Sequence, residues 1–102
     1  RVVQAQVDRL ESEIDTLNQA LAPLRSFVLP GGTAAATHLH LARTVSRRAE
    51  RLMVELAATE GEAVAPPALK YINRLSDFLF VASRFLNAKA GGDVLWIPGQ
   101  NR

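Results

Sequence analysis

The chain has 102 residues, a formal net charge of +2 at pH 7 and no cysteine. Its hydrophobic fraction of 48% and charged fraction of 22% are typical of one small folded domain with a single core. The absence of cysteine excludes disulfides, a thiolate nucleophile and a thiolate metal site, and it fits a reducing cytoplasm. No segment offers the roughly 18 to 20 consecutive apolar residues of a membrane span. We therefore expect a cytoplasmic protein with no membrane partner.

The first segment predicts a long amphipathic helix that ends around residues 24–26. Its apolar residues recur at alternating spacings of four and three, which is a heptad pattern that must be buried against other helices. They are Val3, Val7, Leu10, Ile14, Leu17, Leu21 and Leu24. Pro23 is expected to distort the last turn. A break follows at Pro30-Gly31-Gly32, and Thr33 is suited to cap the next helix.

Two further helices are predicted, over about 33–58 and from Pro66-Pro67 to about Asn87. At about 100° per residue, the apolar residues of the second helix gather on one side and its polar residues nearly opposite. The apolar set is Leu41, Val45, Ala49, Leu52 and Leu56, and the polar set is His40, Arg43, Arg47 and Glu50. The third helix has a core stripe of Ile72, Leu75, Leu79, Ala82 and Leu86.

The fold class is therefore all-α, a helical bundle that forms a single domain over residues 1–102 with a flexible tail at 91–102. No strand-pairing signal is present. Three helices alone cannot fully bury three apolar stripes, so we expect a partner helix or subunit. The chain also starts abruptly on a helical pattern, from which we expect a segment upstream of Arg1.

A row of arginines is the strongest local feature. Arg43, Arg47 and Arg51 are four residues apart and share one helical face. Their charges repel unless an anion or carboxylates offset them, and Glu50 is placed to offset part. The remainder suits a polyphosphate, whose geometry and charge guanidinium groups match. From this motif alone, a solvent-exposed helix face with ordinary surface ion pairs is slightly favoured over a polyphosphate site.

A polar pair on the third helix and an aromatic residue before the glycine turn are further candidates. Asn73 and Asp77 lie one turn apart and could hold a purine, a ribose or an arginine; the favoured alternative is an inter-helix contact that sets register. Phe27 is either a residue that fills the core, which is the commoner case, or a wall for a large flat ligand.

The second predicted helix carries two histidines. His38 lies on its apolar side, which indicates a core histidine. His40, on the arginine side, adds only a weak metal signal.

Familiar catalytic arrangements are absent from the sequence. It has no glycine-rich phosphate loop with lysine, no Ser–His–acid pattern and no paired carboxylates in a cleft context. If the chain belongs to an enzyme, its reactive group must come from a cofactor or a substrate.

Three segments, in this order and at these separations, resemble the PduO-type ATP:cob(I)alamin (corrinoid) adenosyltransferase family: 27–33, 40–51 and 71–80. The resemblance covers roughly residues 7–93. It implies a five-helix bundle whose N-terminal part is missing from this chain, and a homotrimer with active sites between subunits. It also implies transfer of the 5′-deoxyadenosyl group of ATP to the cobalt of cob(I)alamin, with release of triphosphate and participation of Mg²⁺. Co(I) is then the nucleophile.

The resemblance further implies a role for each candidate residue. Arg47 would contact the ATP phosphates, and Arg43 would form a salt bridge with an acidic residue of the adjacent subunit. Four residues would lie against the nucleotide or support that site: Glu50, Asn73, Arg51 and Asp77. Phe27 would close the lower face of the corrin and exclude an axial ligand, which makes Co(II) easier to reduce. The tail from Gly91 to Trp96 would help to cover the corrinoid.

Two other functional classes stay open on the sequence. One is a non-catalytic helical oligomerisation or interaction module, whose arginine-rich face binds an acidic partner. The other is a small nucleic-acid-binding bundle, which Glu50, the near-neutral total charge and the lack of exposed aromatic residues disfavour. We expect no nucleic-acid partner and no metal site built from protein side chains.

Overall fold

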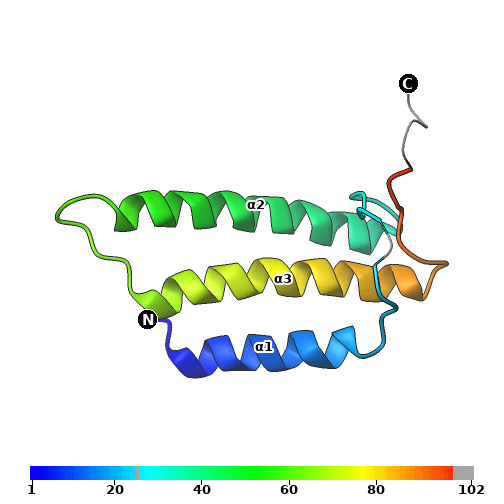
Figure 1. Ribbon diagram of the computed structural model, residues 1–102, viewed down its shortest axis with the longest axis horizontal. Coiled ribbons are helices and arrows are strands. Elements are labelled where there is room, and N and C mark those ends of the chain that lie inside the picture. The colour runs from blue at the N-terminus through cyan, green and yellow to red at the C-terminus, as the bar shows by residue number, and fades with distance from the viewer. Residues whose placement is uncertain (25, 98–102) are drawn as a thin grey trace.

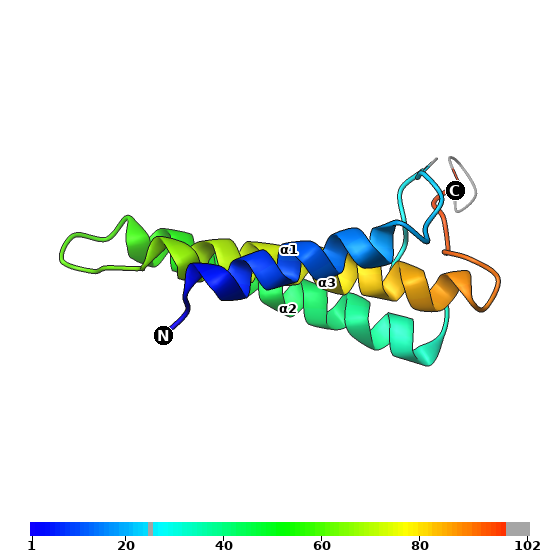
Figure 2. The same cartoon turned by 90° about the horizontal axis from the view of Figure 1, so that it is seen from below.

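The structure, a computed structural model, describes residues 1–24 and 26–97 and contains three α-helices over that range. These are α1 (Gln4–Asn18), α2 (Ala34–Ala57) and α3 (Pro66–Ala88). Helix α3 lies in the middle, and α1 and α2 pack on two sides of it (Figure 1; Figure 2). The predicted all-α helical fold is confirmed. None of the helices in the described part is both long and apolar enough to cross a bilayer.

Helix α1 ends at Asn18, earlier than the predicted range of 24–26. Pro23 has no N–H to donate and disfavours a helical conformation at Ala22, so the helix cannot continue through this point. The Arg84 guanidinium fixes the alternative path, because its Nη2 donates to the Ala22 carbonyl at 2.9 Å. Of the predicted stripe, Val7 and Leu10 are buried, but Val3 and Leu24 at its two ends are exposed.

The predicted boundaries of α2 are confirmed, but its predicted buried face is wrong. Thr33 caps the helix by accepting a hydrogen bond from Ala36 N at 3.1 Å. Leu41 and Val45 are each 61% exposed, and the other two leucines of the predicted stripe, Leu52 and Leu56, are also exposed. The residues that α2 buries are Ala36, His40 and Ser46. Helix α2 therefore packs on α3 with its polar side, because that side forms the specific contacts described below.

Helix α3 begins at Pro66 as predicted, with proline in its first turn. Its predicted apolar stripe is only half-buried, and the residues that it buries are mainly polar: Ser76, Val81, Ser83, Arg84 and Asn87. Burial of polar groups is tolerated when they are hydrogen-bonded. Ser83 Oγ donates to the Phe80 carbonyl at 2.6 Å, and Arg84 Nε donates to Asp93 Oδ2 at 2.9 Å. The small serines let neighbouring chain segments approach closely.

Asn87 joins the end of α3 to the start of α2. Its side chain is 1% exposed, its Oδ1 accepts from Thr33 N at 3.0 Å, and its Nδ2 donates to the Gly31 carbonyl at 2.8 Å. Gly32 has a φ of +103°, and a Cβ at this position would overlap the Asn87 amide. The turn at 30–33 is therefore held on α3, which also positions Phe27 just upstream.

The segment after α3 pairs with the segment before α2. Leu29 N donates to the Val94 carbonyl at 2.7 Å and Trp96 N donates to the Phe27 carbonyl at 2.8 Å, around an isolated antiparallel bridge between Val28 and Leu95. That bridge was not expected from the sequence. Flexibility of the tail over 91–102 stays a prediction, and its residues 98–102 lie outside the described residues.

We expect Gly32→Ala to lower the free energy of unfolding by about 1–3 kcal/mol more than Gly91→Ala does. Both glycines have positive φ, +103° and +108°, so both variants carry the same backbone strain of roughly 1–2 kcal/mol. Only the Cβ at residue 32 would also displace the Asn87 amide, since nothing lies within 4 Å of a Cβ at Gly91. Urea unfolding of both variants measures the difference. Equal destabilisation would show that Asn87 does not hold this turn.

Candidate functional site

Glu50, on the same helix as the arginine row, meets Asn73 across the contact between α2 and α3. Asn73 Nδ2 donates to Glu50 Oε2 at 2.9 Å, which joins the two helices directly. One turn along α3 is Asp77, whose charge opposes the lowering of the Arg43 pKa by burial and by Arg47. We call this contact and the charged residues around it the polar seam: Arg43, Arg47, Glu50, Asn73 and Asp77. The Asn73–Asp77 motif of α3 therefore meets α2 at Glu50, beside the arginine row.

Arg43 is the most enclosed arginine of the row. Its guanidinium lies over the Phe80 ring, 4.7 Å from the centroid, in a cation–π contact. Burial and the neighbouring Arg47 charge lower the pKa of Arg43, and Asp77 opposes that shift. An arginine nevertheless keeps its proton in proteins. Arg43 Nε is buried and makes no hydrogen bond to the residues that the structure describes.

The other two arginines, Arg47 and Arg51, are exposed. The Glu50 carboxylate accepts a hydrogen bond from Asn73, and across residues 1–24 and 26–97 no ion pair joins it directly to an arginine. That Glu50 offsets part of the arginine charge stays a prediction. The exposed guanidinium groups of Arg47 and Arg51 are suited in charge and geometry to an anion.

Two charged residues that the sequence analysis did not single out extend the polar seam towards α1. Arg74 Nη1 donates to Asn73 Oδ1 at 2.6 Å, and Arg74 Nε donates to Glu11 Oε1 at 2.8 Å. Arg74 is adjacent to Asn73 in the chain, which is the one sequence signal for its role. Glu11 gives no such signal, because its contact depends on how α1 packs against α3.

Phe27 is 76% exposed, so the alternative that it plugs the core is wrong. Its ring meets the Trp96 ring edge-on, with centroids 6.1 Å apart and planes at 69°. The backbone hydrogen bond from Trp96 N to the Phe27 carbonyl holds the two residues together. Two aromatic side chains therefore form an exposed apolar surface at the end of the molecule where α2 begins.

The two histidines have the opposite placement to the one predicted. His38 is exposed, whereas His40 is 5% exposed and packs edge-on against Phe80 at a centroid distance of 6.3 Å. Residues two apart on a helix point about 200° apart, so burial of one exposes the other. Burial lowers the pKa of His40, the Arg43 charge lowers it further, and Asp93 opposes both. The imidazole is therefore neutral at pH 7.

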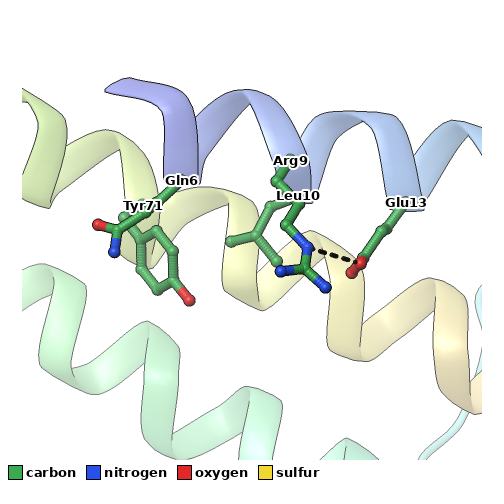
Figure 3. Close-up of a pocket in the computed structure, with 5 residues that line it drawn as sticks. All are labelled: Gln6, Arg9, Leu10, Glu13 and Tyr71. Carbon is green, nitrogen blue, oxygen red and sulfur yellow. Dashed lines mark hydrogen bonds and ion pairs between the residues drawn. The ribbon is translucent and has the colours of Figure 1, made fainter. Parts of the chain in front are cut away.

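A shallow cavity of about 280 Å³ lies elsewhere, between α1 and α3 (Figure 3). Its lining residues are Gln6, Arg9, Leu10, Glu13 and Tyr71. The Arg9–Glu13 ion pair at 3.2 Å occupies part of its rim. No residue of the polar seam reaches it. The candidate site is thus an open helix face rather than an enclosed cavity, and the part of the chain that is described holds no cluster of three or more potential metal-ligating acids or histidines.

A three-helix arrangement with an arginine-rich seam and a separate aromatic surface defines a helical-bundle protein suited to an anionic ligand. The family model for cobalamin adenosyltransferase matches residues 1–86. The chain therefore belongs to the cobalamin adenosyltransferase family, as the resemblance of its three segments indicated.

Similar proteins carry the same description. The corrinoid adenosyltransferase of Mycobacterium tuberculosis H37Rv is 49% identical over 102 residues, which is 100% of this chain and 52% of that protein. The corrinoid adenosyltransferase of Bacillus subtilis is 43% identical over 95 residues, 92% of this chain and 48% of that protein. The chain thus spans about half the length of the curated relatives it matches.

Solved structures give the same result for the fold. A variant PduO-type ATP:corrinoid adenosyltransferase from Lactobacillus reuteri, complexed with cobalamin and ATP, superposes with a TM-score of 0.81 at 40% identity, over 90% of this chain and 49% of that one. A second variant of that protein, complexed with ATP, gives a TM-score of 0.83 at 39% identity, over 95% of this chain and 54% of that one.

We expect stability to fall as the pH drops below about 6.5, through protonation of His40. Its pKa in the folded protein lies below the ordinary value of 6.5, so the unfolded chain binds the proton more readily. The contribution of neutral His40 to the free energy of unfolding is therefore fully present above pH 6.5. It is lost as the pH falls from 6.5 through the lower pKa that His40 has in the folded protein. Urea unfolding across this range measures the slope for wild type and for His40→Gln. His38→Asn, at the exposed histidine, should keep the wild-type slope; an unchanged slope in His40→Gln would contradict the assignment.

Proposed function

We propose that this chain is part of an ATP:corrinoid adenosyltransferase, which transfers the 5′-deoxyadenosyl group of ATP to cob(I)alamin, forms adenosylcobalamin and releases triphosphate. The observation that carries the proposal is the polar seam, where Asn73 and Glu50 are hydrogen-bonded at 2.9 Å beside the arginine row. Membership of the cobalamin adenosyltransferase family supports it. ATP in the similar Lactobacillus reuteri structures supports the choice of nucleotide.

In this proposal the arginine side of the seam binds the triphosphate. Arg47 is exposed and next to the enclosed cation of Arg43, so its guanidinium can take two phosphate oxygens at once. Glu50 and Asn73 keep hydrogen-bonding capacity beyond their mutual bond, and we assign them to the nucleoside part. Arg51 and Asp77 support these groups. Mg²⁺ is proposed as a counter-ion of the triphosphate, because it is commonly bound together with substrate phosphates.

The aromatic surface is assigned to the corrinoid. Phe27 offers an exposed flat ring beside Trp96, which suits the lower face of a corrin. An apolar ring at that face supplies no ligand atom and keeps water from the axial position of cobalt. Trp96 and the rest of the tail segment 91–96 would cover the bound corrinoid from the side.

The chemistry needs no nucleophile from the protein. In the transfer, cobalt supplies the electron pair for the new Co–C bond at C5′, and the C5′–O bond breaks with its pair leaving on triphosphate. The residues of the chain align C5′ with the cobalt and stabilise the charge on the departing triphosphate. Arg43 and Arg47 are placed for the second task.

We also propose that the protein is cytoplasmic and works as a homotrimer of five-helix bundles, with active sites between subunits. In that assembly Arg43 would pair with an acidic residue of the adjacent subunit. The exposed apolar residues of α2 support an assembly, because a partner surface would bury them. These residues are Leu41, Val45, Leu52, Val54 and Leu56.

We expect Arg47→Ala to weaken binding of ATP–Mg²⁺ by roughly 10- to 100-fold, which corresponds to the loss of a charge-assisted hydrogen bond. Arg48→Ala is the control, because it removes an exposed arginine that is one residue off the row. Isothermal titration of the intact protein measures both affinities. If the two variants bind equally well, the phosphates are not held by the arginine row.

Phe27→Ala should leave the fold almost intact, because the side chain it removes is 76% exposed. We expect adenosylation of cob(II)alamin under reducing conditions to slow by at least about tenfold, since the ring no longer excludes the axial ligand. Turnover assays together with the spectroscopic signature of four-coordinate Co(II) check this, and unchanged ATP affinity serves as the control. If Phe27→Ala keeps wild-type turnover and still forms four-coordinate Co(II), Phe27 is not part of the corrinoid site.

A further inference from the structure

We propose that Glu11 and Arg74 are positioning residues for the nucleotide, which act by fixing the amide of Asn73. This inference rests on the proposed function, since it takes the polar seam as the ATP site. It extends that site to a helix, α1, whose residues have no assigned part in it.

The contacts form one continuous chain across all three helices. Glu11 on α1 accepts from Arg74 Nε on α3 at 2.8 Å, and Arg74 Nη1 donates to Asn73 Oδ1 at 2.6 Å. Asn73 Nδ2 then donates to Glu50 Oε2 on α2 at 2.9 Å. Each of the three links involves at least one ionised group, and such charge-assisted hydrogen bonds are short and strong.

The chain determines which way the Asn73 amide points. An asparagine side chain has an acceptor and a donor of nearly the same shape, and rotation by 180° exchanges them. Here the Arg74 guanidinium donates to the amide oxygen, and the Glu50 carboxylate accepts from the amide nitrogen. The reversed amide would place its N–H groups against the Arg74 donor and its oxygen against the Glu50 carboxylate. A ligand that approaches the seam therefore meets a fixed pattern of one free N–H and one free lone pair.

Glu11 acts on the Asn73 amide indirectly, by fixing the orientation of the Arg74 side chain. The Arg74 side chain is 34% exposed, which leaves it room for other rotamers. A carboxylate that binds Nε turns the guanidinium plane so that Nη1 points to Asn73. Lysine has no such planar fork, so it cannot bind Glu11 and Asn73 in this geometry.

A purely structural tether between α1 and α3 is the competing explanation. Half-exposed ion pairs contribute little to stability, and the Glu11 side chain is 45% exposed. A tether would act on folding, and its loss would affect ATP affinity equally whether or not Asn73 is present. A positioning role acts only through Asn73, which makes the two explanations separable.

The test measures ATP–Mg²⁺ affinity by isothermal titration, KM for ATP and for corrinoid, and melting temperature, all in the intact protein. We expect Glu11→Gln and Arg74→Lys to weaken ATP binding by roughly three- to tenfold and to raise KM for ATP by the same factor, with KM for corrinoid unchanged. In an Asn73→Ala background, Glu11→Gln should have no further effect on ATP affinity. Glu13→Gln is the matched control, because it removes the charge of another glutamate of α1, whose ion pair with Arg9 lies within that helix.

Each outcome decides between the explanations. A wild-type protein that binds no ATP overturns the proposed function, and this inference with it. Wild-type binding with unchanged affinity in Glu11→Gln overturns the positioning role alone. Additive losses in the Asn73→Ala background, with a lower melting temperature, identify a structural tether instead.

Discussion

The hydrogen bond from Asn73 to Glu50, at 2.9 Å, sets the rotation of α2 on α3, and most of the structure follows from that rotation. Polar groups at a helix contact cost less free energy when they are paired, and Glu50 on the polar side of α2 has its partner on α3. With Glu50 inward, His40 is also inward against Phe80, and Leu41 is left outside. The arrangement thus places charge inside the contact and apolar surface outside it.

Helix α3 holds the two halves of the proposed site at a defined separation. Asn87 fixes the turn that carries Phe27, and Asn73 lies fourteen residues away, about 21 Å along the helix axis. Phe80 lies between them and contacts both His40 and Arg43. The aromatic surface and the arginine row are therefore linked by one rigid element, which suits a reaction in which a nucleotide and a flat ring must be aligned.

Local signals in the sequence predicted what local interactions determine. Thr33 and Pro66 mark the starts of α2 and α3, because a capping hydroxyl and a first-turn proline act within one helical turn. Long-range contacts determined the rest. The end of α1 depends on the bond from Arg84 to Ala22, and the buried face of α2 on contacts with α3. The sequence analysis singled out both Glu50 and Asn73, which the structure brings into contact, whereas the contact of Glu11 with Arg74 has no sequence signal.

The most direct test of the account is to follow the side-chain amide resonances of Asn73 and Asn87 by NMR while ATP–Mg²⁺ is added to the intact protein. Both amides are hydrogen-bonded on α3, but only Asn73 belongs to the polar seam. The account predicts that the Asn73 resonances shift in proportion to bound nucleotide, while those of Asn87 stay in place. Saturating ATP with no change at Asn73 would show that the nucleotide binds elsewhere.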